Sequence, residues 1–198
     1  AQASAETYMG QVEVGVGLIP AGGGTKELLV RFTNGIQFGV GDPLPLIQRV
    51  FQLIGFGKVS ASAEEAKHLG LLREIDGITM RRERLLHSAV KVATELAKTG
   101  YQRPRTKQNI AVGGNDIRAA LDLSVHLALR AGRLSEHDAL IGRTLSRILA
   151  GGDIPHATTV TENHLLDLER EAFLSLCGET RTQDRMTHML TTGKTLRN

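Results

Sequence analysis

Hydrophobic residues recur every three or four positions along most of this chain, which is the spacing of an amphipathic α-helix. The segments that carry this pattern are 26–32, 42–54, 83–98, 117–131, 135–149, 162–177 and 182–192. Glycine follows most of them, and a glycine just beyond a helix readily adopts the left-handed conformation that ends it. The pattern therefore predicts a mainly α protein in which these segments are helices.

Two helix starts carry an additional capping signal. Ser62 is followed three residues later by Glu65, and Ser135 is followed three residues later by Asp138. This spacing lets a hydroxyl and a carboxylate each accept a backbone N–H group at the start of a helix. The first of these helices is short and is expected to end at Gly70. In the helix after Ser135, the expected buried face consists of Leu140, Ile141, Leu145, Ile148 and Leu149.

The N-terminal segment has a different character, because it is rich in valine and glycine and has little charge. Its partial alternation predicts a strand over residues 5–16. Glu13 is the single charged residue between Tyr8 and Ile19. An isolated carboxylate in an apolar segment either finds hydrogen-bond donors or has its pKa raised. It is therefore either an ordinary residue at the end of a strand or a candidate acid/base.

A glycine run, 22–24, follows this segment and precedes a helical pattern. Glycines allow close approach of the backbone to a ligand, and a helix N-terminus offers unpaired N–H groups. Two nucleotide motifs are nevertheless incomplete here. Pro20 stands where the third glycine of the dinucleotide fingerprint belongs, and the glycine run lacks the Gly-Lys-Ser/Thr ending of a phosphate loop. The sequence therefore favours neither kind of nucleotide site.

Composition narrows the class of protein further. The chain has 198 residues and a net charge of +3, which suits one domain, or a large part of one, and tolerates an anionic ligand. One cysteine excludes an intrachain disulfide and suits a reducing cytoplasm. No apolar run approaches the roughly 20 residues of a membrane span, and the first ten residues lack the pattern of a signal peptide. Metal-binding and nucleic-acid-binding motifs are absent from the sequence.

Three short motifs taken together resemble the crotonase (enoyl-CoA hydratase/isomerase) superfamily. They are Gly-Gln-x-Glu at 10–13, Gly-Leu-Ile-Pro at 17–20 and Gly-Gly-Gly-Thr at 22–25. The amino-acid sequences of segments 6–20, 165–179 and 189–198 are similar to those of one branch of this superfamily. That branch is the bacterial bifunctional 3-hydroxyacyl-CoA dehydrogenases, which carry a crotonase module after their NAD-binding part.

This resemblance implies a division of the chain. Residues 1–75 would be the C-terminal part of a crotonase-like core with a short β remnant, and 76–198 would be additional C-terminal helices. Residues 99–109 form the best linker candidate, with Gly100, Pro104 and several basic residues. They are either a solvated loop or a contact for the phosphates of coenzyme A or a neighbouring subunit. A further loop near the substrate is expected over 35–41.

The resemblance also implies a chemical role for Glu13. In the family, the corresponding glutamate exchanges a proton while water adds across the α,β double bond of an enoyl-CoA. Gly10, Pro20 and Ala21 would line the acyl or water site, although Ala21 stands where many members have glycine. The backbone donors for the thioester oxygen, and the NAD site, would lie outside these residues. No cofactor is expected in this chain, and the chain alone is expected to be inactive.

The expected partners are an acyl-CoA thioester and further copies of the chain, with neither nucleic acid nor membrane. A different reading remains open from the residues themselves. The chain would then be a non-catalytic helical interaction module, and Glu13 a structural residue. Two other residues have expected structural roles: Cys177 as a buried, inert thiol, and Glu27 as a first-turn carboxylate favoured by the helix dipole.

Overall fold

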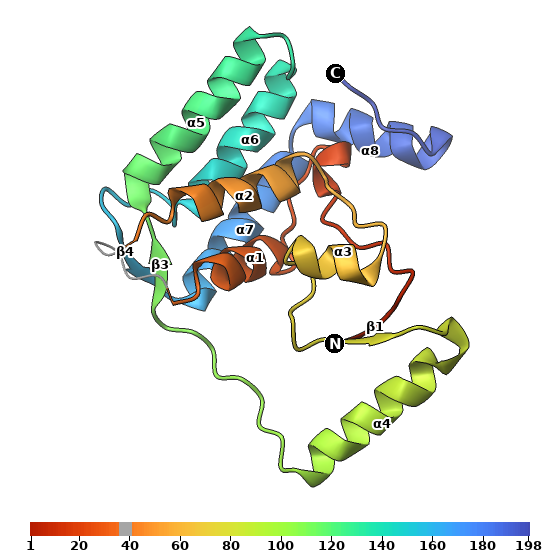
Figure 1. Ribbon diagram of the computed structural model, residues 1–198. Helices are drawn as coiled ribbons and strands as arrows, with labels where there is room; N and C mark the ends of the chain where they lie inside the picture. Colours follow the sequence, from red (N-terminus) through yellow and green to blue (C-terminus); the bar gives the residue numbers. More distant parts are fainter. Residues whose placement is uncertain (36–40) are drawn as a thin grey trace. The chain divides into compact units, whose positions relative to one another are not determined.

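The computed structural model describes residues 1–35 and 41–198 (Figure 1). Its helices are α1 (Gly24–Thr33), α2 (Leu44–Gly55), α3 (Ala63–His68), α4 (Leu85–Lys98), α5 (Gly114–Arg130), α6 (Glu136–Leu149), α7 (Glu162–Cys177) and α8 (Thr180–Thr192). Two 3-10 helices are η1 (Glu13–Val16) and η2 (Arg82–Arg84). The short strands are β1 (Gln2–Ser4), β2 (Gly77–Thr79), β3 (Ile110–Val112) and β4 (Thr158–Val160). The prediction of a mainly α protein is confirmed.

The contacts divide the chain into two compact units. The first unit contains residues 1–10 and 59–106, and the second contains residues 11–58 and 107–198. The expected division after residue 75 separates a crotonase-like part from additional C-terminal helices. It stays a prediction, because these contact-based units do not test it. The predicted loop over 99–109 contains neither helix nor strand and leads from the first unit into the second. The loop expected over 35–41 lies largely outside the described residues.

The second unit is built around α6. This helix packs against α1, α2, α5 and α7, and α5 and α6 form an antiparallel hairpin (Figure 1). Strands β3 and β4 form a short antiparallel pair. In the sequence, β3 directly precedes α5 and β4 directly precedes α7. The side chains that form the centre of this core are completely or almost completely buried: Leu29, Ile47, Ile54, Leu121, Leu145, Ile148, Leu149 and Leu165. Burial of this many branched aliphatic side chains is the main driving force for the unit.

The helix ends follow the local signals. Ser135 accepts the N–H of Asp138, and Asp138 accepts the N–H of Ser135, which completes the predicted capping box of α6. Ser62 likewise accepts the N–H of Glu65 at the start of α3. Gly70 follows α3 with a φ of 76°, the left-handed conformation that favours glycine. These contacts are local in sequence, which is why spacing alone predicted them.

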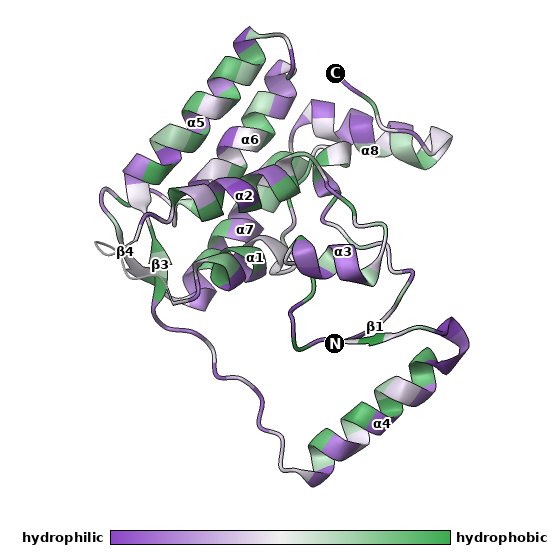
Figure 2. Ribbon diagram, viewed as in Figure 1, coloured by the Kyte–Doolittle hydropathy of each residue, from purple (hydrophilic) through white to green (hydrophobic). Residues whose placement is uncertain are grey.

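The first unit has little core of its own. Strands β1 and β2 pair in parallel, with Ala3 opposite Ile78. Helix α4 contains the predicted apolar positions, coloured green in Figure 2, but the structure places none of its residues in the interior of the described chain. Leu86 is 77% exposed and Val90 is 56% exposed. The amphipathic pattern therefore predicted the helix correctly and leaves its apolar side at the surface.

Three expectations from the sequence are wrong. Residues 5–16 are not a strand: β1 ends at Ser4, and Glu13 begins a 3-10 helix. Glycines at 10, 15 and 17 weaken a strand, and no neighbouring strand pairs with 11–16 within the described residues. Leu140 is 37% exposed, whereas His137 on the same helix is buried. Cys177 is only half-buried.

Two negative findings concern the described residues alone. None of their helices has both the length and the apolar character that crossing a bilayer requires. No group of three or more histidine, cysteine, aspartate and glutamate side chains is arranged there to hold a metal ion.

Candidate functional site

Glu13 is held by a tight turn at the beginning of the second unit. The N–H groups of Gly15 and Gly17 donate to the carbonyls of Val12 and Val14 at 2.9 and 3.1 Å, which is the bonding pattern of a 3-10 helix. The N–H of Leu18 then returns to the carbonyl of Glu13 at 3.1 Å. The glutamate is therefore attached to a backbone whose polar groups are bonded on both sides of it.

The turn ends at Gly17, whose φ of 86° is left-handed. A Cβ atom at this position would lie 3.0 Å from the Cα of Thr182 and 2.8 Å from its hydroxyl. Both the conformation and the close approach of α8 therefore require glycine.

A buried hydrogen-bond chain holds this glycine from the other side. Thr182 donates its hydroxyl to the carbonyl of Gly17 at 2.9 Å, and the Nε2 of His137 lies 2.8 Å from the same hydroxyl. A hydroxyl has one proton, so His137 is the donor in the second contact. Burial, and after it the charge of Arg185, lower the pKa of His137, which favours the neutral ring. The chain links α6 and α8 to the turn that carries Glu13.

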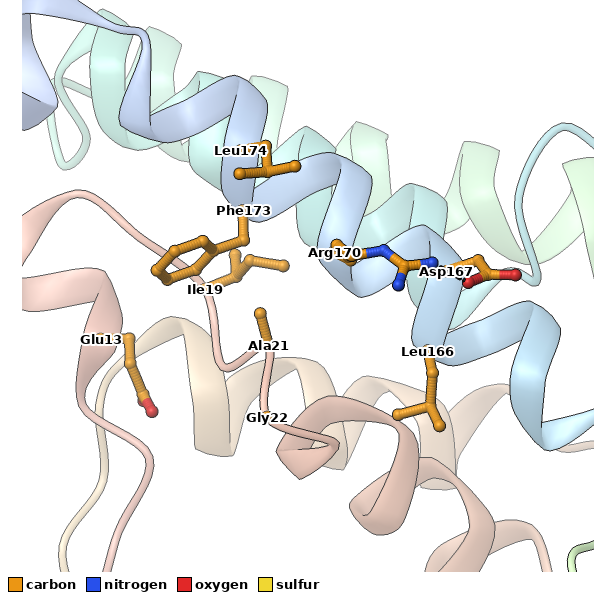
Figure 3. Close-up of a pocket in the computed structure, with 9 residues that line it drawn as sticks. All are labelled: Glu13, Ile19, Ala21, Gly22, Leu166, Asp167, Arg170, Phe173 and Leu174. Atoms are coloured by element: carbon orange, nitrogen blue, oxygen red, sulfur yellow. Dashed lines mark hydrogen bonds and ion pairs between the residues drawn. The ribbon is translucent and has the colours of Figure 1, made fainter.

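Glu13 lines a pocket of about 520 Å³ in the second unit (Figure 3). One wall consists of Glu13, Ile19, Ala21 and Gly22. The opposite wall is one side of α7, formed by Leu166, Asp167, Arg170, Phe173 and Leu174. This volume and this largely apolar lining with few polar groups are typical of small-molecule sites.

The polar groups of the pocket are unevenly distributed. Arg170 forms an ion pair with Asp167, one helical turn earlier, and both side chains are exposed. Figure 3 shows this pair on α7 beyond Ala21 and Gly22, whereas the ring of Phe173 lies nearer to Glu13, above Ile19. Glu13 thus provides the ionisable group at the apolar end of the pocket.

One carboxylate oxygen of Glu13, Oε2, is buried and has no hydrogen-bond partner among the described residues. Most buried polar atoms in proteins are hydrogen-bonded, because an unpaired one costs about 1–3 kcal/mol. None of the described residues donates to this oxygen, so the protein's own hydrogen bonds leave its accepting capacity unused. This is the feature of the pocket that points most directly to chemistry.

The N-terminus of α1 lies next to the pocket, and two N–H groups there are paired with a side chain of α7. Glu169 of α7 is fully buried, and its carboxylate accepts the N–H of Gly23 at 2.8 Å and the N–H of Lys26 at 2.5 Å. Burial raises the pKa of Glu169, although the two N–H groups and the charge of Lys26 act in the other direction. The N–H groups of Gly23 and Lys26 are therefore engaged by the protein itself.

The sequence analysis missed Glu169, although a signal for it exists. On α7 it lies between Leu165, Leu168 and Ala172, all of which are buried. An acidic residue in phase with the apolar side of a helix must be paired in the interior. Its partner could not be named from the sequence, because Lys26 and Glu169 are 143 positions apart.

The structure separates the other predicted site residues. Ala21 lines the pocket with Glu13. Pro20 is buried behind it, and its carbonyl accepts the hydroxyl of Thr25 at 2.8 Å. Gly10 belongs to the first unit, where it pairs with Val59 in an isolated antiparallel bridge, and it is not among the pocket residues.

Gly24, in the glycine run, packs closely against residues of the other two short motifs. A Cβ atom at Gly24 would lie 2.6 Å from the side-chain nitrogen of Gln11 and 3.1 Å from the Cβ of Pro20. To admit such a Cβ, the amide end of Gln11 would have to move and Pro20 would have to shift by a few tenths of an ångström, so glycine at 24 fits the present packing of these two side chains. The three short motifs noted in the sequence therefore meet at the start of α1.

Comparison with known proteins gives one informative similarity. No profile of a known protein family matches the chain. A protein of Bacillus subtilis (strain 168) named "Probable 3-hydroxyacyl-CoA dehydrogenase" is 46% identical to it over 197 residues. The alignment covers 100% of this chain but 24% of that protein. The relative is named as an enzyme, and this chain spans about a quarter of its length. The similarity extends over the whole of this chain.

Proposed function

We propose that this chain supplies the acid/base glutamate of an enoyl-CoA hydratase site within a longer protein. The observation that carries the proposal is the buried, unpaired oxygen of Glu13 in an apolar pocket. Glu13 is also the residue that the crotonase-like motif assigns to proton exchange. The fold around it would be the C-terminal half of a crotonase-like module.

The name of the relative supports the same reaction sequence. Hydration of a trans-2-enoyl-CoA produces a 3-hydroxyacyl-CoA, and the relative is named for oxidising a compound of this class. A protein that carries both activities would pass the product of one to the other. We assign the NAD-dependent oxidation to residues outside this chain, because Glu13–Val16 forms a 3-10 turn rather than the strand, glycine turn and helix that bind a dinucleotide.

In the proposed reaction, the oxygen of a water molecule forms a bond to C3 of the enoyl group, and the π bond between C2 and C3 breaks. The water gives up one proton and C2 takes up one, so that one H2O is added in total. Glu13 is within the pocket to exchange a proton with the water and the substrate. The side chains of Ile19, Phe173 and Leu174 give this pocket apolar walls for the acyl group. Donors that polarise the thioester carbonyl are also required, and we assign them to the remainder of the longer protein.

The proposal is tested with Glu13→Gln in the longest natural protein that contains this chain. Hydration of a trans-2-enoyl-CoA, followed by loss of absorbance of the conjugated thioester, is expected to fall about 10²- to 10⁴-fold. NAD-linked oxidation of a 3-hydroxyacyl-CoA by the same sample should be unchanged, which shows that the protein is folded. Unchanged hydration by this variant would overturn the proposal.

A matched control is available close to Glu13. Glu27 lies in the first turn of α1 and accepts the Nε–H of Arg31 at 2.9 Å, as expected for a first-turn carboxylate. It does not line the pocket. Glu27→Gln changes the charge by the same amount and should leave hydration unaffected.

A second candidate function is self-association, and α4 favours it. Leu86, Val90 and Leu96 are 77%, 56% and 45% exposed on this helix. Leu86 and Val90 lie one helical turn apart on the same side of α4. Exposed apolar residues grouped in this way commonly mark surfaces that bind another protein, and the candidate partner here is a second copy of the chain. Leu86→Glu with Val90→Glu should then reduce the molar mass measured by light scattering. An unchanged mass would exclude self-association through α4.

A further inference from the structure

A second cavity lies within the second unit, and the proposed hydration does not use it. Its volume is about 570 Å³, and its walls come from η1, α2, α5, α6, α8 and residues 195–197. Val14 and Gly15 line it, whereas the neighbouring Glu13 lines the first pocket. The two cavities are therefore separate spaces beside the same turn.

The interior of this second cavity is apolar. Side chains of Phe51, Leu121, Val125, Ile141 and Leu145 line it. Phe56, also in its lining, is 77% exposed. Leu121, Val125, Ile141 and Leu145 are already almost completely buried. The apolar area that a ligand would cover therefore lies mainly at Phe56 and the half-buried Phe51, and covering it with an aliphatic or aromatic group gains free energy.

Most of the charged residues that line this cavity are positive. They are three arginines, Arg133, Arg185 and Arg197, and one aspartate, Asp138. Asp138 already pairs with the buried Arg185 at 2.8 Å and lies 3.6 Å from Arg197. Arg185 also donates to Asn198, and Arg197 donates to the carbonyl of Arg133. Arg133, which is exposed, is therefore the guanidinium of the lining for which the described residues provide no partner, and guanidinium groups bind carboxylates well.

We propose that this second cavity binds an amphiphilic anion, namely an aliphatic chain that ends in a carboxylate. The chain would lie along the apolar walls, and the head would lie at Arg133. The volume falls within the range of small-molecule sites. The inference rests on charge and shape complementarity, and it does not depend on the proposed hydratase activity.

The chain offers a simple reporter, because it contains no tryptophan. Phe56→Trp introduces one at the exposed edge of the cavity. Titration of the 198-residue chain with dodecanoate, kept below its micelle concentration, should give a saturable change in tryptophan emission. Dodecanol should bind at least about tenfold more weakly, since it lacks the charge that the arginines attract, and acetate should have no effect. Equal affinity for the acid and the alcohol would overturn the assignment of the head group.

Two substitutions separate the head from the chain, measured by calorimetry in the longest natural protein that carries this sequence. Arg133→Gln, at an exposed position, should weaken dodecanoate about tenfold and leave dodecanol unchanged. Ala128→Phe should fill the cavity and remove binding of both. Ala119→Phe is the matched control, because it lies exposed on the same helix and does not line the cavity.

The outcomes remain distinguishable from those of the hydratase test. Glu13→Gln should leave dodecanoate affinity unchanged, even if hydration is lost. Dodecanoate affinity that survives Ala128→Phe would locate the ligand elsewhere and overturn the proposal. The absence of any saturable binding to the unmodified protein would overturn it as well, and would leave an apolar segment of another protein as the occupant to test.

Discussion

Two glutamates lie close to the same pocket, and their environments are opposite. Glu169 is completely buried, and each of its oxygens accepts a backbone N–H at the start of α1. Glu13 is half-buried, and its buried oxygen has no partner among the described residues. One carboxylate thus pairs with the protein's own donors, while the other keeps an oxygen that no described residue pairs.

This contrast shows why burial alone does not identify a catalytic acid. By burial, Glu169 would be the stronger candidate for an unusual group, and its pKa is raised. Its hydrogen bonds show that its role is to join α7 to α1. The unpaired oxygen of Glu13 is the better indicator of chemistry, because a protein gains nothing structural from leaving it unpaired.

The comparison predicts that removal of Glu169 costs the most stability. Glu169→Ala leaves the N–H groups of Gly23 and Lys26 unpaired in the interior, so the free energy of unfolding should fall by about 2–4 kcal/mol. Urea denaturation measures this. Glu171→Ala on the same helix, where an exposed side chain pairs with Arg147 at 3.2 Å, should cost less than about 1 kcal/mol.

If Glu13→Ala destabilised the protein as much as Glu169→Ala, the distinction between the two carboxylates would fail. We expect a change below about 1 kcal/mol at Glu13, because the lost group makes no hydrogen bond through its buried oxygen.

A second prediction concerns the turn that carries Glu13. Gly17→Ala should destabilise the protein by about 2–3 kcal/mol, because it adds a left-handed alanine and a clash with Thr182. Gly132, with a φ of 68° and open space around it, isolates the conformational part. Gly132→Ala should cost only about 1 kcal/mol by the same denaturation measurement. Equal losses of stability for Gly17→Ala and Gly132→Ala would show that a Cβ at position 17 does not clash with Thr182.

The third prediction tests the hydrogen-bond chain behind that turn. Thr182→Val preserves the shape of the side chain but leaves the carbonyl of Gly17 and the Nε2–H of His137 without this partner. The free energy of unfolding should fall by about 1–2 kcal/mol. Thr182→Ser keeps the hydroxyl and should retain most of the stability. A larger loss for serine than for valine would assign the role of Thr182 to packing.

The smallest expected effect is a difference in pH dependence between two glutamates of α7. Burial raises the pKa of Glu169 above its ordinary 4.5, so the folded state holds that proton more tightly. Its contribution to stability is therefore complete below about pH 4.5 and is lost as the pH rises through the folded value. Glu169→Gln should remove this decline from a series of urea denaturations at increasing pH.

Glu162 should show the opposite sign. The hydrogen bond from Lys26, at 2.6 Å, and then the N–H of Lys107 lower the pKa of Glu162. Its contribution is present above pH 4.5 and is lost as the pH falls through the folded value. Glu162→Gln should flatten the acid side of the same series. Identical slopes for the two variants would contradict the difference in environment.

The sequence by itself determined the helices, because their signals are local. Helix α7 was predicted over the same residues that it occupies, 162–177, and the capping box at Ser135 formed as its spacing required. Apolar periodicity and caps act within a few residues, so they can be read without knowledge of the rest of the fold. The same local reading selected Glu13 as an isolated carboxylate.

Only the tertiary structure decided how that carboxylate is presented. The strand expected over residues 5–16 is replaced by a turn that Thr182 holds from a distance of 165 positions. Glu169 accepts N–H groups at the start of α1 although it lies 143 positions from Lys26. Gly10 and Glu13, three positions apart, belong to different units. Such contacts depend on which surfaces pack together, and no local pattern encodes them. The unpaired oxygen, which carries the proposed function, is a property of that packing and could not be predicted from the sequence.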